Sequence, residues 1–132
     1  MEIRQFRVVV RARDFERTCR FYGEVLAFPR LQSWDREDSR GALYQAGAGA
    51  IEVLGRGHGA RLDGRDEAFD YEGPEQKLAL SFVVASVEKA YEEISFRERN
   101  IPGGLIRERD GSTVFQTHDP DGVRLSFRQN GA

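Results

Sequence analysis

Residues 8–29 read VVVRARDFERTCRFYGEVLAFP, and residues 80–102 read LSFVVASVEKAYEEISFRERNIP. Each stretch opens with a short run rich in β-branched residues, which is typical of a strand. A helix N-cap residue follows at the same place, Asp14 in the first copy and Ser86 in the second, 72 residues later. Apolar residues then recur at helical spacing, and each helical pattern ends before a proline. The two stretches predict an internal duplication.

Three strand-like runs follow each predicted helix. They cover residues 30–35, 42–45 and 50–54 after the first helix, and residues 105–108, 113–117 and 123–128 after the second. The last two runs are joined by Asp119-Pro120-Asp121-Gly122, whose proline and glycine positions favour a tight hairpin turn. The prediction is an α+β fold in which two βαβββ modules form a cupped mixed sheet.

Length and composition set the limits of this fold. A chain of 132 residues is enough for one domain, in which module one covers residues 1–54 and module two residues 77–130. The polar, glycine-containing stretch 55–76 is predicted to link them. A net charge of −2 and a pI near 5.8 give no support to a nucleic-acid partner.

The sequence contains no apolar run long enough for a membrane span and no secretory signal in its first residues. Its single cysteine, Cys19, cannot form an intrachain disulfide. We therefore expect a cytoplasmic protein without a membrane partner. Cys19 lies on the inward side of the first predicted helix, where a small buried apolar residue is the expected role.

Alternation along the predicted strands separates two faces of the sheet. In the first strand, Val8 and Val10 share an apolar face that is expected to pack against a helix. The opposite faces of the strands are mixed, and they would line a cleft if the modules curve around one another. The charged residues on these mixed faces are Arg7, Arg11, Glu52, Arg124 and Arg128.

The chain resembles the vicinal oxygen chelate superfamily, which includes glyoxalase I, extradiol dioxygenases, fosfomycin resistance proteins and bleomycin resistance proteins. The resemblance rests on a strand, Asp14 and a helix carrying FYxxVLxF at residues 21–28, on IEVL at 51–54, and on HDPDGVRLSF at 118–127. It spans nearly the whole chain. It implies the paired βαβββ fold and a homodimer.

Metal-binding members of that superfamily carry one ligand on each of the first, fourth, fifth and eighth strands. The resemblance places these positions at Arg7, Glu52, Ala79 and Ser126. Glu52 is a good ligand and Ser126 a poor one, whereas alanine cannot coordinate and arginine would repel a cation. We expect the inherited metal site to be lost and no cofactor to be bound. A site rebuilt from His58 and His118 would require both histidines to reach Glu52.

Arg7 and Glu52 are the strongest candidates for residues of a ligand-binding site. Either Arg7 holds an anionic or carbonyl-bearing ligand while Glu52 orients it, or the two residues form a plain internal ion pair. Glu52 is also a candidate general base. Ser126, Arg11, Arg124 and Arg128 would favour an acidic ligand, although arginines at strand ends are often solvated. Trp34 and Tyr44 would either stack on a flat ligand or pack in the core.

The resulting hypothesis is a metal-independent protein similar to the bleomycin resistance branch, which sequesters an anionic or aromatic small molecule in the sheet cleft. One alternative is a metal-dependent lyase, isomerase or dioxygenase like the glyoxalase and extradiol branches. Another is a degenerate member that serves as a dimerisation or interaction module. These alternatives differ in whether a metal is bound and in whether the cleft takes a ligand.

Overall fold

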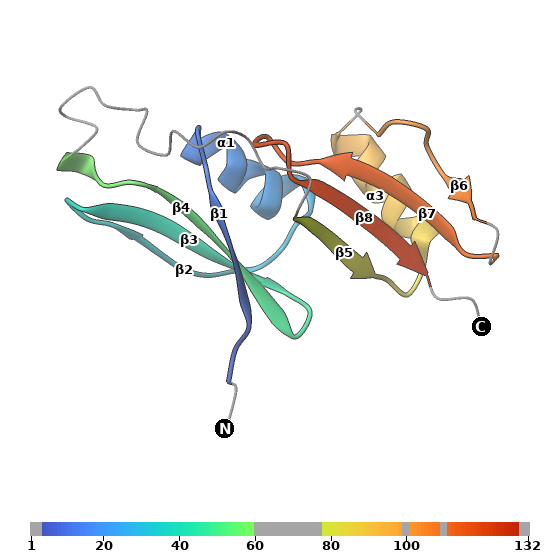
Figure 1. Cartoon of the computed structure of the whole chain (residues 1–132), viewed down its shortest axis with the longest axis horizontal. Coiled ribbons are helices and arrows are strands. Elements are labelled where there is room, and N and C mark those ends of the chain that lie inside the picture. Colours follow the sequence, from blue (N-terminus) through green and yellow to red (C-terminus); the bar gives the residue numbers. More distant parts are fainter. Residues whose placement is uncertain (1–3, 60–77, 99–100, 109–110, 130–132) are drawn as a thin grey trace. The chain divides into compact units, whose positions relative to one another are not determined.

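The computed structural model describes residues 4–59, 78–98, 101–108 and 111–129. The chain divides into two compact units, Met1–Tyr71 and Glu72–Ala132. The division falls inside the stretch predicted as a linker, of which residues 60–76 lie outside the described residues. Each unit contains one four-stranded mixed sheet, and the two sheets have the same topology (Figure 1).

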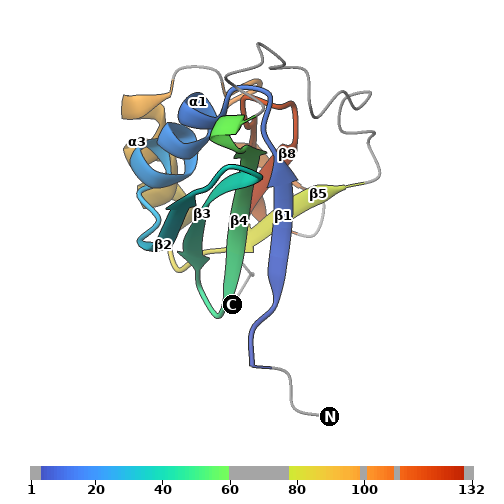
Figure 2. The same cartoon turned by 90° about the vertical axis from the view of Figure 1, so that its left-hand side faces the viewer.

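The first unit follows the predicted order of elements. β1 (Arg7–Arg11) leads into α1 (Phe15–Arg20), which continues as the π-helix η1 (Phe21–Val25). Three antiparallel strands follow, at β2 (Arg30–Asp35), β3 (Ser39–Ala46) and β4 (Gly49–Arg56). The sheet has the order β1-β4-β3-β2, with β1 parallel to β4, as Figure 2 shows. β4 runs two residues past the predicted module boundary at residue 54.

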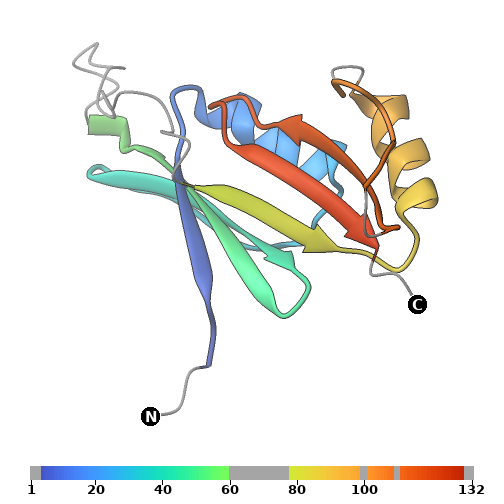
Figure 3. The same ribbon diagram turned by 45° about the vertical axis from the view of Figure 1, so that its right-hand side comes forward.

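The second unit repeats this arrangement. β5 (Ala79–Val83) is followed by α3 (Val87–Arg97), β6 (Ile106–Arg107), β7 (Thr113–His118) and β8 (Arg124–Gln129). The sheet order is β5-β8-β7-β6, again with the first and last strands parallel. α3 packs against β7 and β8 (Figure 3). The predicted duplication is therefore confirmed in topology as well as in element order.

Local signals in the sequence account for the ends of these elements. The side chains of Asp14 and Ser86 accept hydrogen bonds from the backbone N–H groups of Arg17 and Lys89, as N-caps do. The Asp119 carboxylate accepts from the N–H groups of Asp121 and Val123, at 2.8 and 2.9 Å, and thereby closes the predicted hairpin turn. The two predicted helix N-termini and the predicted hairpin turn thus form through short-range hydrogen bonds.

The end of the first helix differs from the expected regular helix. From Phe21 to Val25 the helix widens into a π-helix, which sequence periodicity does not predict. Ala27 follows with a φ of 58°, in the left-handed region that a side chain disfavours. The widened turn lies where Gly23 approaches Tyr44 so closely that a Cβ atom would come within 3.0 Å of the tyrosine ring.

Most residues of the predicted apolar faces are buried, whereas Val8 in β1 is half-buried. Val10, Ile51 and Val53 form the core of the first sheet on the α1 side. In the second unit Val123, Leu125 and Phe127 are buried, and the Phe127 ring stacks on Phe115. In the described part of the chain, no helix is long and apolar enough to cross a membrane.

Candidate functional site

Arg7 and Glu52 form an ion pair on the face of the first sheet that points away from α1. They are diagonal neighbours on parallel strands, because Arg7 lies opposite Ala50 and Val9 lies opposite Glu52. The guanidinium Nη1 of Arg7 donates to Oε1 of Glu52 at 2.7 Å. The side chain of Glu52 is 16% exposed and that of Arg7 40% exposed. The carboxylate is therefore mostly enclosed, while part of the guanidinium remains open to solvent.

The Nε and Nη2 groups of Arg7 determine whether the ion pair can also bind a ligand. Its Nε donates to the side-chain oxygen of Gln5, so Gln5 and Glu52 hold the guanidinium from two directions. Among the described residues, no acceptor contacts its Nη2. A planar cation fixed at two donors and open at a third is suited to an anionic oxygen atom.

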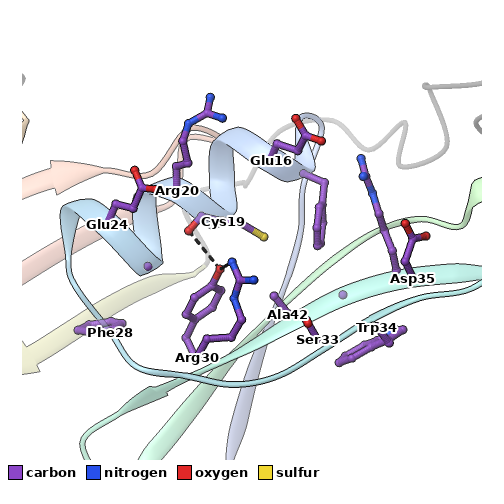
Figure 4. Close-up of a pocket in the computed structure, with 15 residues that line it drawn as sticks. Glu16, Cys19, Arg20, Glu24, Phe28, Arg30, Ser33, Trp34, Asp35 and Ala42 are labelled. Atoms are coloured by element: carbon purple, nitrogen blue, oxygen red, sulfur yellow. Dashed lines mark hydrogen bonds between the residues drawn. The ribbon is translucent and has the colours of Figure 1, made fainter.

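Trp34 lies on the same sheet face but at the far edge. Its register partner is Gly41, which lies opposite Leu54 of β4, and its ring covers Gly41. Figure 4 shows the Trp34 side chain directed away from α1. Three strand spacings separate β1 from β2, a lateral distance of roughly 14 Å. A compact ligand held by Arg7 therefore does not reach Trp34.

Tyr44 lies on the opposite face of the sheet from Glu52, since its register partner is Ile51. It is 1% exposed, and its hydroxyl donates to the backbone carbonyl of Cys19 on α1 at 3.2 Å. Burial raises the pKa of Tyr44 to about 12. Of the two alternatives for Tyr44, the structure has the core position: the side chain packs against α1, on the opposite sheet face from Glu52.

A group that the sequence reasoning missed surrounds Tyr44. Arg30 of β2 donates from Nη2 to the Tyr44 hydroxyl at 3.1 Å. The guanidinium of Arg40 lies over the Phe15 ring, 4.4 Å from its centroid. Cys19 is buried beside them, as expected, and burial is the main reason that the pKa of its thiol is raised. Only the register of β2 against β3 could have revealed this group.

The candidate residues of the second unit lie on the mixed face of its own sheet. Ser126 stands between Ser81 of β5 and Gln116 of β7 in register, so three polar side chains form a row across three strands. Arg128 lies 3.8 Å from the Glu108 carboxylate. The remaining candidates of this unit are Ala79, which is exposed, and Arg124, which lies opposite it in register.

The residues at the four positions that the resemblance assigns to metal ligands do not fit a metal ion. Ala79 has no donor atom, Arg7 carries a positive charge, and the Oε1 atom of Glu52 is already occupied by Arg7. His58 follows β4, is exposed, and donates its backbone N–H to Arg36. His118 is the last residue of β7 and is also exposed. The residues that the structure describes include no cluster of three or more His, Cys, Asp or Glu side chains suited to a metal.

Comparison with known proteins places this architecture in context. The sequence model of the Glyoxalase/Bleomycin resistance protein/Dioxygenase superfamily matches residues 4–127. The uncharacterized protein YraH of Bacillus subtilis (strain 168) is 34% identical over 95 residues, which cover 71% of this chain and 70% of YraH.

Two solved structures share the fold. One is a glyoxylase/bleomycin resistance protein/dioxygenase domain from Frankia sp. EAN1pec, with a TM-score of 0.72 and 15% identity over 99% of this chain and 93% of that one. The other is a protein of unknown function from Agrobacterium tumefaciens str. C58, with a TM-score of 0.67 and 20% identity over 99% and 97% of the two chains.

Proposed function

Because the chain belongs to the Glyoxalase/Bleomycin resistance protein/Dioxygenase superfamily, we propose that it is a small-molecule-binding member that works without a bound metal ion. In this proposal Arg7 holds an anionic oxygen of the ligand on the face of the first sheet. The observation that carries the proposal is the 2.7 Å contact between Arg7 and Glu52, at two positions where metal-binding relatives are expected to have ligands.

The charge of the site supports this assignment. A metal ion would bring positive charge to a site of neutral and anionic ligands, and the Arg7 guanidinium brings positive charge to the same face. Unlike a metal ion, the guanidinium is covalently attached to the chain and cannot dissociate from the site. Glu52 keeps the guanidinium in one orientation, which reduces the entropy that Arg7 loses when a ligand binds. Gln5 restrains the Nε side of the same group.

Elemental analysis tests the metal-independent part of the proposal. Purified protein incubated with Zn²⁺, Ni²⁺, Mn²⁺ or Fe²⁺ and then desalted should retain no stoichiometric metal, because the residues at the expected ligand positions offer one carboxylate already paired with arginine. A metal retained at one equivalent and lost in Glu52→Ala would overturn the proposal. The chain would then be assigned to the metal-dependent lyase, isomerase or dioxygenase alternative.

Calorimetric titration with the dianion oxalate and with inorganic phosphate tests the role of Arg7. At least one of these anions should bind, equally well with and without EDTA, and Arg7→Gln should weaken its binding about ten-fold or more. Arg7→Lys should restore only part of the affinity, because an ammonium group lacks the planar fork. Arg107→Gln, at an exposed position of β6 in the second unit, is the matched control. If neither anion binds, the interaction-module alternative is favoured instead.

We also propose that the protein is a homodimer. Both sheets have open edge strands that carry exposed apolar side chains, Val9 and Leu31 in the first unit and Val83 and Ile106 in the second. Such residues are commonly covered when chains associate. Light scattering after size exclusion should give twice the mass of 15.0 kDa at micromolar concentration. A mass of one chain over the whole concentration range would contradict this part.

A further inference from the structure

A cavity of about 700 Å³ lies between α1, η1 and the strands β2 and β3, on the side of the first sheet opposite Arg7 and Glu52. Its volume is within the range that small-molecule sites occupy. Its lining combines apolar rings and small residues with three arginines, as Figure 4 shows in part. The lining includes Phe15, Cys19, Arg30, Arg40, Ala42 and Tyr44.

A β-bulge in β2 turns Arg30 into this cavity. Arg30 pairs with Tyr44 and Gln32 pairs with Leu43, so Leu31 is an extra residue between the two pairs. In a regular strand, without the bulge, Arg30 and Gln32 would share one face of the sheet. With it, Arg30 lies on the α1 side, while Gln32 stays on the opposite side. Bulges often re-aim side chains next to functional sites.

Arg30 and Arg40 both line the cavity, and neither has a carboxylate partner among the described residues. The Arg30 guanidinium is held by the buried hydroxyl of Tyr44, at 3.1 Å, and by contact with the tyrosine ring. Arg40 stacks on Phe15, and its Nε atom is buried without a hydrogen-bond partner. Within residues 4–59, neither guanidinium forms a salt bridge. A buried donor that lacks an acceptor is costly, so a bound anion would stabilise it.

The helix above the cavity is shaped to leave this space. Its π-helical turn η1 contributes Gly23, whose missing side chain accommodates the Tyr44 ring at the base of the cavity. π-helical turns occur frequently at functional sites. Tyr44 in turn is fixed to the Cys19 carbonyl, so the hydroxyl that positions Arg30 is itself anchored.

We propose that this cavity is a second ligand site, for a small monocarboxylate with an apolar or aromatic body, whose carboxylate is bound by Arg30 and Arg40. The aromatic ring of Phe15 and the methyl group of Ala42 would contact the body of the ligand. Glu16, Glu24 and Asp35 also line the cavity and balance the charge of Arg20, Arg30 and Arg40. This balance favours a single negative charge over a phosphate dianion.

The test is a fluorescence titration of the full chain with 2-naphthoate, compared with the neutral 2-naphthamide and with inorganic phosphate. We expect saturable binding of 2-naphthoate and at least ten-fold weaker binding of the amide and of phosphate. Arg30→Gln and Arg40→Gln should each weaken 2-naphthoate binding about ten-fold or more. Arg7→Gln, on the opposite face, should leave it unchanged, and circular dichroism establishes that each variant is folded.

Cys19 supplies a second readout that needs no variant. It is the single cysteine of the chain and lines the cavity, so 2-naphthoate should slow its alkylation by iodoacetamide in proportion to occupancy. The inference is overturned if 2-naphthoate does not bind, if it binds without protecting Cys19, or if both arginine variants bind it like the parent. Loss of binding in Arg7→Gln alone would assign this ligand to the Arg7 site, which overturns the second site and supports the proposed function.

Discussion

Removing either member of the Arg7–Glu52 pair should destabilise the protein, and by unequal amounts. Arg7→Met leaves a carboxylate that is 16% exposed without its cation, whereas Glu52→Gln leaves a guanidinium that is 40% exposed and can be hydrated. Exposed pairs contribute about 0.2–1 kcal/mol, and breaking a buried pair costs about 3–5 kcal/mol. This pair lies between those limits. We expect a loss of about 2 kcal/mol for Arg7→Met and about 1 kcal/mol for Glu52→Gln.

A double-mutant cycle measures the interaction itself. The free energies of unfolding of the parent, Arg7→Met, Glu52→Gln and the double variant come from urea titrations at pH 7, followed by circular dichroism. The coupling energy should be about 1 kcal/mol, because the contact of 2.7 Å is short but one partner is partly hydrated. Glu92→Gln, an exposed carboxylate on α3, is the control and should change stability by less than about 0.5 kcal/mol.

Two results would refute this reasoning. A coupling energy below about 0.3 kcal/mol would mean that Glu52 does not hold Arg7 in place, and the ligand-orienting role of Glu52 would lose its basis. A larger loss for Glu52→Gln than for Arg7→Met would mean that burial of the carboxylate is not the dominant cost. Either outcome is separable from a general folding defect, since the slope of the urea titration would stay unchanged.

Three further predictions concern a turn, a strained residue and a buried hydroxyl in the two units. Asp119→Ala should lower the free energy of unfolding by about 2–4 kcal/mol, because two backbone N–H groups lose their acceptor. Asp119→Asn, which keeps an acceptor oxygen, should lower it by less, and urea titration of both variants measures the difference. Ala27→Gly should raise the thermal midpoint, by a stabilisation of about 0.5–1 kcal/mol, since φ at this residue is 58°; a lower midpoint would contradict the strain argument. Tyr44→Phe should cost about 1 kcal/mol at pH 8 through its lost hydrogen bonds. That cost should shrink as pH rises from 10 toward 12, because the unfolded parent ionises this tyrosine near pH 10 and the folded one only near 12; a gap that widens with pH would contradict the assignment.

Short-range signals in the sequence were sufficient for the elements and for the duplication. Asp14 and Ser86 cap their helices by hydrogen bonds that reach three residues, and Asp119 closes a turn four residues long. The Arg7–Glu52 pair was also predictable. Strict alternation in β1 and β4 places their apolar residues on one face, so Arg7 and Glu52 must share the other. That Arg7 and Glu52 share a face follows from alternation along each strand. That they meet follows from the pairing of β1 with β4.

In β2 and β3, the alternation of apolar and polar residues does not show which side chains face α1. In β3, Ala42, Leu43 and Tyr44 are consecutive and all buried, so hydrophobicity does not distinguish the two faces. In β2 the bulge at Leu31 reverses the facing of Arg30, and no residue there marks a bulge by its type. This is why the sequence left two alternatives open for Tyr44 and did not single out Arg30. Pairing between strands decides both positions.

The sequence by itself determined the duplicated βαβββ order of elements, the helix caps, the hairpin turn and the outward face that Arg7 and Glu52 share, because each depends on a few neighbouring residues or on simple alternation. Only the tertiary structure decided that Tyr44 and Arg30 meet under α1, that the first helix widens at Gly23, and that a cavity remains between them. These features arise from contacts between segments distant in the chain, where strand register and helix packing set which side chains meet.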